Sequence, residues 1–268
     1  MRARALLLAL LLAVAPASPA AAAPVTVRFA ESVTHGFLVV KAAAGGGTIA
    51  HGEFIQHPQG ERTHNQLTFR FTDGSLYEEQ VTFTQRRVFR LMSYKLVQKG
   101  PSFPQATEVT FDRDSGRYRA RAGNDTSEGK LDLPEDAHNG LTGLLLKNVP
   151  PGAGASGHLL AFTPRPHVLR TTMSRQGEDK FLVGDATHTA TRWLVDLEIP
   201  GVKGVLASLV GKEPPDLNYW IATGPAPGFV KFEGAMFLKG PRWRVELSGP
   251  GWPDGASRSA PPGSARRS

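Results

Sequence analysis

The stretch PPGAGASGH, Pro150–His158, carries the spacing Gly-x-Gly-x-x-Gly at Gly152, Gly154 and Gly157. In dinucleotide-binding enzymes such glycines let the backbone approach a pyrophosphate, and they follow a strand and open a helix. Here they follow a predicted helix and precede a predicted strand. Because the order of the elements is reversed, the pattern predicts a flexible joint near residues 150–157, and we expect no cofactor.

His51 and Glu53, in the stretch TIAHGEFIQ, are the nearest approach to a catalytic pair. Residues two apart on a strand point to the same side, about 6 to 7 Å from each other. Such a pair can share a proton or hold one metal ion, but a metal site needs further ligands. No His-Glu-x-x-His or Gly-x-Ser-x-Gly motif occurs. We therefore expect no metal site and keep a hydrolase built on this pair as the weakest hypothesis.

Aromatic side chains are a stronger signal than ionisable ones. Seven of them occupy apolar positions of alternating stretches, namely Phe69, Phe71, Tyr77, Phe83, Trp193, Phe232 and Trp243. A curved sheet would turn them toward one interior, where they either form the protein's own core or line an apolar cavity that holds a ligand. Arg244 shares one side of its strand with Glu246, opposite Trp243, so it either pairs with Glu246 or binds a polar head group.

Alternation of apolar and polar residues predicts a mainly β protein. The alternation is interrupted by Asp73-Gly74 in QLTFRFTDGSLYEEQVTF and by Asp112–Gly116 in EVTFDRDSGRYRAR. Both are hairpin signals, because glycine takes the positive φ that tight turns need. The stretch RVFRLMSYKLVQ is apolar on both sides, which predicts a strand covered on both faces. Similar stretches along the chain predict roughly ten to twelve strands.

Two short helices are expected among the strands. LPEDAHNGLTGLLLKN has Pro134 in its first turn and leucines at helical spacing, and Asn148 ends it. PGVKGVLASLVGKEPP, residues 200–215, has one apolar stripe. With few crossover helices the sheet must be largely antiparallel, and a sheet this wide curls. The predicted architecture is a wide curved antiparallel sheet that forms an open barrel or half-barrel, with two short helices.

The two ends of the chain predict an exported protein with one domain. Arg2 and Arg4 precede an apolar run and a small-residue stretch, which is typical of a secretory signal peptide over residues 1–23. A single β-rich domain is expected over 24–249, followed by a disordered tail rich in Gly, Pro, Ser and Arg over 250–268. The chain has no cysteine, so we expect no disulfides and no lipid-anchored cysteine.

Charge excludes one class of partner. The net charge of +7 includes two arginines of the predicted signal peptide and, in the tail, three arginines and one aspartate, so about +3 remains on the predicted domain. No dense run of Lys and Arg is interleaved with aromatic residues, so we expect no nucleic-acid partner. The basic ends are compatible with peripheral contact with an anionic membrane.

Four motifs resemble an uncharacterised family of exported bacterial proteins. They are DGSLYEE at Asp73–Glu79, VQKGPSFP at Val97–Pro104, DLPEDAHNG at Asp132–Gly140, and GKEPPDLNYWIATGPAPGFVKFEGAMFLKGPRWRVEL at Gly211–Leu247. The resemblance covers nearly all of the chain after the predicted signal peptide. It implies a bacterial envelope or secreted location and no particular activity. The order of strands and helices is also similar to the half-barrel proteins that carry lipid-modified proteins across the periplasm, a likeness of fold only.

These observations favour an exported protein that is not an enzyme, although the sequence leaves that question open. The first hypothesis is non-catalytic binding of a lipid or other apolar ligand in a half-barrel cavity, with the seven aromatic residues and Arg244 as its contacts. The alternative is a structural or protein-interaction module whose interior is filled by its own side chains. The hydrolase based on His51 and Glu53 is the third hypothesis.

Overall fold

The computed structural model describes residues 24–162, 165–198, 216–237 and 239–252. Within these ranges fourteen strands form one sheet, and a single helix lies between the eighth and ninth strands. No helix within these ranges is long and apolar enough to span a bilayer. The elements are β1 (Thr34–Ala42), β2 (Thr48–Gln59), β3 (Arg62–Phe71), β4 (Leu76–Gln85), β5 (Phe89–Lys99), β6 (Thr107–Asp112), β7 (Arg117–Ala122), β8 (Asp125–Lys130), α1 (Thr142–Asn148), β9 (Ala155–Phe162), β10 (Pro166–Val183), β11 (Ala186–Glu198), β12 (Leu217–Ala222), β13 (Gly228–Gly234) and β14 (Trp243–Leu247).

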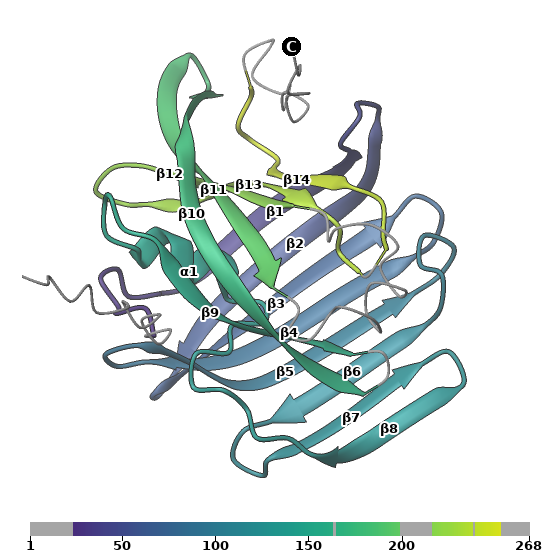
Figure 1. Cartoon of the computed structure of the whole chain (residues 1–268). Helices are drawn as coiled ribbons and strands as arrows, with labels where there is room; N and C mark the ends of the chain where they lie inside the picture. Colours follow the sequence, from purple (N-terminus) through teal and green to yellow (C-terminus); the bar gives the residue numbers. More distant parts are fainter. Residues whose placement is uncertain (1–23, 163–164, 199–215, 238, 253–268) are drawn as a thin grey trace, which may run out of the picture.

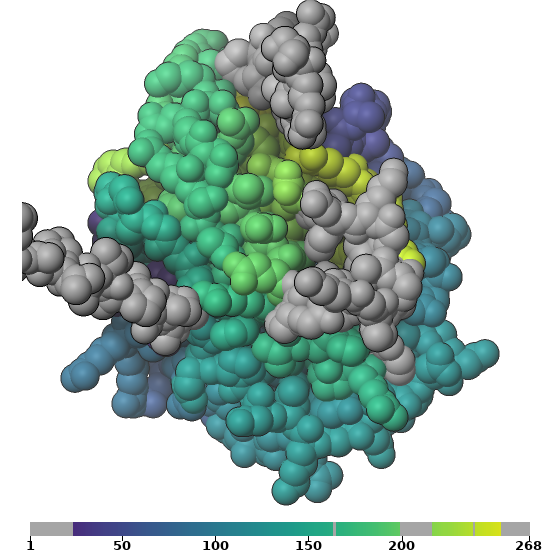
Figure 2. All heavy atoms as spheres, viewed as in Figure 1, coloured from purple at the N-terminus to yellow at the C-terminus, as the bar shows by residue number. Residues whose placement is uncertain are grey.

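The order of the strands shows how the chain folds back on itself. The sheet runs β8-β7-β6-β5-β4-β3-β2-β1-β14-β13-β12-β11-β10-β9, so β1 and β14 meet near its centre. All neighbouring strands in this order are antiparallel, and β8 and β9 are the two edges, which are not joined to each other. Because the sheet curls, its second half lies over the first, as Figures 1 and 2 show. The prediction of a mainly β, wide, curved and open antiparallel sheet is confirmed.

Both predicted hairpin turns are present. Gly74 joins β3 to β4 with a φ of 85°, and Gly116 joins β6 to β7 with a φ of 62°. The backbone N–H of Ser75 donates to the carboxylate of Asp73 at 2.9 Å, which braces the first turn. Because a tight turn sets the register of its hairpin, Phe69 faces Tyr77 across β3 and β4, on the side that becomes the interior.

A bulge in β5 changes which side chains face the interior. Val81 pairs with Tyr94 and Phe83 pairs with Leu91, so the register shifts by one residue and Met92 is the extra one. Leu91 and Tyr94 are three residues apart, yet both belong to the same buried cluster. A bulge reverses the alternation of a strand at that point. The prediction of a strand that is apolar on both faces is therefore wrong for these residues.

Helix α1 is shorter than predicted, because it starts at Thr142 rather than near Pro134. Gly140 has a φ of 67°, in the left-handed region, which interrupts helical geometry. The side chain of Asn139 donates to the carbonyl of Leu160 and accepts from its N–H, both at 2.9 Å, so this segment is tied to β9 instead. The second predicted helix lies at residues outside the described ranges.

Two large apolar clusters lie in the interior of the described part of the chain. The first, which we call the helix cluster, surrounds α1 and includes Phe83, Leu91, Phe111, Leu141, Leu145, Leu146, Trp193 and Val195. The second, the central cluster, lies where β1 and β14 meet and includes Leu38, Val40, Phe69, Phe71, Phe103, Phe232, Trp243 and Val245. The two clusters together hold the two halves of the sheet against each other, because burial of apolar surface is the main favourable term in folding.

The N-terminal segment is fastened to the end of α1. Asn148 is fully buried, and its side-chain oxygen accepts the backbone N–H groups of Arg28 and Phe29, each at 2.7 Å. Lys147 Nζ lies 2.5 Å from a carboxylate oxygen of Glu31, and both side chains are largely buried. The residues of the predicted signal peptide, 1–23, lie outside the described part of the chain.

Residues 251 and 252, which follow the predicted domain, contact β10 and β13. Gly251 and Leu182 exchange two backbone hydrogen bonds, of 2.7 and 2.9 Å. The rings of Trp220 and Trp252 lie on either side of Lys231 Nζ, at 3.8 and 3.9 Å from the ring centroids. Lys231 is fully buried, and burial lowers its pKa. Residues 253–268 of the predicted tail are not among those described.

Candidate functional site

The seven predicted aromatic residues all lie in the interior, with 9% or less of their surface exposed. They divide between the helix cluster (Phe83, Trp193) and the central cluster (Phe69, Phe71, Tyr77, Phe232, Trp243). Their rings contact other rings; the centroids of Phe71 and Trp243, for example, are 5.1 Å apart. The structure therefore places these side chains in the packed walls of the interior.

Arg244 is separated from the aromatic residues, because it projects from the other face of β14. Its guanidinium Nε donates to Glu233 at 2.9 Å and lies 3.7 Å from Glu246. Glu246 in turn accepts from Lys41 at 3.0 Å. Opposite charges alternate along this part of the outer face, so Arg244 satisfies two largely buried carboxylates there.

His51 and Glu53 lie on the exposed outer face of β2, where both are solvent-accessible. The residues that alternate with them, Ala50 and Gly52, face the interior. Glu53 accepts from His35 at 2.8 Å across β1 and β2 rather than from His51. The hydrolase hypothesis required this pair to share an enclosed site, so we drop it.

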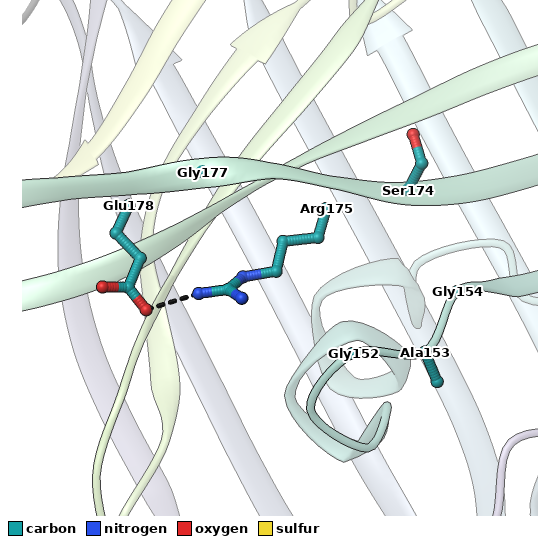
Figure 3. A pocket seen from close by; sticks show the side chains of 7 residues that line it. All are labelled: Gly152, Ala153, Gly154, Ser174, Arg175, Gly177 and Glu178. Atoms are coloured by element: carbon teal, nitrogen blue, oxygen red, sulfur yellow. Dashed lines mark hydrogen bonds and ion pairs between the residues drawn. The ribbon is translucent and has the colours of Figure 1, made fainter.

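The glycine-rich stretch lies between α1 and β9, in the order helix, loop, strand. Gly152, Ala153 and Gly154 line an open pocket of about 600 Å³ together with residues of β10 (Figure 3). Arg175 projects into it and is bound to Glu178 at 2.5 Å. The joint itself is shorter than expected, because β9 begins at Ala155.

A row of partly accessible residues separates the two clusters. Leu67, Glu79 and Leu96 are cross-strand neighbours on β3, β4 and β5, on the inner side of the sheet. Leu217 and Tyr219 come from β12 in the other half, and with Leu96 they pack against both clusters. All five remain partly accessible to solvent, although the clusters on either side are buried. We call these five residues the seam.

Glu79 is the acidic residue of the seam. Its Oε1 accepts a hydrogen bond from the hydroxyl of Tyr94 at 2.8 Å and a longer one from Tyr77 at 3.3 Å. Gly140 passes close to the other oxygen, since a Cβ added there would lie 3.1 Å from Oε2 and 2.4 Å from Val81. The loop before α1 and the two hydroxyls therefore fix the position of this carboxyl group.

Burial and mutual interaction shift the pKa values of Glu79 and of the tyrosines around it. Burial raises the pKa of Glu79, and the hydroxyls of Tyr94 and Tyr77 partly offset that effect. Burial also raises the pKa of each tyrosine, including Tyr219, and the nearby Glu79 carboxylate raises it further. The tyrosines therefore remain protonated hydrogen-bond donors near neutral pH. One carboxyl group and several hydroxyls in apolar surroundings are suited to recognise a polar group.

His138 belongs to a second group of hydrogen-bonded polar side chains, which joins the loop before α1 to β10. Its Nδ1 is 3.0 Å from the hydroxyl of Thr142, and its Nε2 is 2.8 Å from that of Thr171. Burial lowers the pKa of His138 to about 4. A neutral imidazole can donate through one nitrogen and accept through the other, so both neighbours are satisfied without a charge. This group fixes the loop before α1 and thus supports Gly140.

Sequence reasoning missed the seam, although part of its signal was present. In LYEEQVTF, Glu79 has the same parity as Tyr77, Val81 and Phe83, which marks it as an inward carboxyl group on an apolar side. Glu78 and Glu79 are adjacent, so alternation places one of them inward and the other outward. The approach of Tyr219 from β12 could not be found from local pattern.

No family model and no curated protein matches the chain. Among solved structures, the β-barrel-like protein of the domain of unknown function DUF1849 from Brucella abortus is similar to it. The two are 11% identical, the match covers 83% of this chain and 99% of that chain, and the TM-score is 0.46. A likeness at this level says nothing about what the chain binds.

Proposed function

We propose that the protein is a non-catalytic binding protein that holds an apolar ligand with a polar end, such as a lipid, in the seam. The observation that carries this proposal is the seam itself. Apolar residues from both halves of the sheet meet there and remain partly accessible, next to one carboxyl group that is held by tyrosine hydroxyls. A fully packed interior would leave no such row.

The two parts of the seam match the two parts of a lipid. Leu67, Leu96 and Leu217 would contact an apolar chain, and burial of apolar surface contributes about 25 cal/mol per Å². Glu79 and Tyr219 would contact the polar end. The buried aromatic residues of the central cluster support this position from behind.

The exported location expected from residues 1–23 belongs to the same proposal. Expression of the full chain in a bacterium should give a mature protein in the periplasmic or secreted fraction, lighter by the mass of about twenty residues. An uncleaved chain in the cytoplasmic fraction, measured by mass spectrometry, would contradict export.

Filling the seam should block binding. The protein is unfolded, extracted with solvent and refolded, and then titrated with N-phenyl-1-naphthylamine, a neutral dye that fluoresces in apolar surroundings. We expect saturable binding to the wild type. Leu67→Trp places a larger ring in the seam, so its dissociation constant should be at least about tenfold higher.

Ile55→Trp is the matched control. Phe54 pairs with Leu67 across β2 and β3 and packs against the central cluster, so the next residue, Ile55, faces outward, where it is 38% exposed. This variant should bind the dye as the wild type does. Equal affinity of Leu67→Trp and wild type would remove the seam as the site. Native mass spectrometry of protein from its own host would show whether a ligand of lipid mass is already bound.

A second candidate function is an interaction module. It is favoured by the dense packing of both clusters and by Phe37 and Ile55, which are 58% and 38% exposed on the outer face. Absence of saturable dye binding to the wild type would favour this reading over the first.

A further inference from the structure

The chemistry of the ligand's polar end follows from the second carboxylate oxygen of Glu79, Oε2. Oε1 is occupied by the hydroxyls of Tyr94 and Tyr77. Within the described ranges no group donates a hydrogen bond to Oε2. The residue is nevertheless partly accessible, so Oε2 is the acceptor that the seam offers to a ligand.

Charge limits what can approach that oxygen. Among the described residues, the influences on the Glu79 carboxyl are its burial and the two tyrosine hydroxyls. No described lysine or arginine acts on it. Tyr219, whose pKa the Glu79 carboxylate raises from the other half of the sheet, is uncharged near neutral pH. A second carboxylate placed here would meet a like charge with no compensating cation among the described residues, and two such groups cannot both remain ionised.

A neutral donor meets no such penalty. An alcohol hydroxyl or an amide N–H can donate to Oε2, and a hydrogen bond to a charged group in low-dielectric surroundings is among the stronger ones. The tyrosine hydroxyls donate to Oε1, so they hold the carboxylate in place to receive it.

We propose that the seam selects apolar ligands whose polar end is an uncharged hydrogen-bond donor, an alcohol or amide, over ligands that end in a carboxylate. This inference rests on the proposed function and specifies its ligand class. It predicts the opposite selectivity to that of a fatty-acid carrier, in which a cation usually meets the carboxylate.

The test compares dodecanol, dodecanamide and dodecanoate as competitors of N-phenyl-1-naphthylamine on the refolded wild-type protein at pH 8. The three share one apolar chain and differ at the polar end. We expect dodecanol and dodecanamide to bind at least about tenfold more tightly than dodecanoate. Equal or tighter binding of dodecanoate would overturn the inference, and this comparison needs no variant.

Glu79→Gln tests the residue itself. It replaces the acceptor-only carboxylate with an amide that can donate to a carboxylate, so the preference for dodecanol over dodecanoate should fall to about twofold or less. Glu78→Gln is the matched control on the outer side of the same strand and should keep the wild-type preference. An unchanged preference in Glu79→Gln would exclude Glu79 as the selecting group.

The possible outcomes distinguish failure of the proposed binding function from failure of the proposed ligand selectivity. If the dye binds and all three competitors displace it equally, the seam binds ligands without this selectivity, and the inference fails alone. If the dye does not bind to wild type, the proposed function fails and the inference fails with it.

Discussion

Gly140→Ala should lower the free energy of unfolding by about 3 kcal/mol, against about 1 kcal/mol for Gly74→Ala. Both glycines have positive φ, at 67° and 85°, so both variants strain the backbone. Only at Gly140 does the new methyl group collide, at 2.4 Å from Val81 and 3.1 Å from Glu79. At Gly74 nothing lies within 4 Å of the added atom.

Urea unfolding followed by tryptophan fluorescence measures both losses, and the slope against urea concentration checks that the unfolded states are comparable. The difference between the two variants isolates the steric contribution, because the backbone contribution is common to them. Equal losses would show that the loop before α1 does not pack closely against β4. A Gly140→Ala protein that is folded should also bind the dye less tightly, since its methyl group displaces the carboxyl group of the seam.

Acidification should destabilise the protein through His138 by about 3 kcal/mol. In the unfolded chain its pKa is near 6.5, whereas burial lowers the pKa in the folded protein to about 4. Between these two values the unfolded state binds more protons, so stability falls as the pH drops through this window. The contribution is fully present above pH 6.5 and is lost by about pH 4.

The measurement is the free energy of unfolding of wild type and His138→Gln between pH 4 and pH 7.5. The variant should be less stable at neutral pH and should lose less stability on acidification. Glu79 acts in the opposite sense, because its pKa is raised, so only the difference between the two proteins is assigned to His138. His51→Gln removes an exposed histidine and should run parallel to wild type. Parallel curves for His138→Gln would contradict the buried neutral imidazole.

Local pattern predicted the parts of the fold that depend on local geometry. The turns at Gly74 and Gly116 follow from the positive φ that glycine accepts, and the alternation in LYEEQVTF places Tyr77 and Phe83 inside. Arg244 and Glu246 are on one face of β14, opposite Trp243, as their spacing requires. These features depend on two or three neighbouring residues, which any strand of that sequence would place in the same way.

Features that depend on distant partners were missed or mistaken. The bulge at Met92 is defined by how β5 pairs with β4, so the sequence of β5 alone does not predict it. The late start of α1 depends on Asn139, whose amide is bound to Leu160 in β9. Trp252 packs over Lys231, although its neighbours in sequence are typical of a disordered tail.

The sequence by itself determined a mainly β chain, its hairpin turns and which side chains could face an interior, because these depend on backbone preferences and the period of a strand. Only the tertiary structure decided that the aromatic residues pack as walls, and that Glu79 accepts from Tyr94 and influences Tyr219 of the other half. The physical reason is that β4 and β12 are brought together by the curl of the sheet, and that curl results from the packing of the whole chain rather than from any one stretch of it.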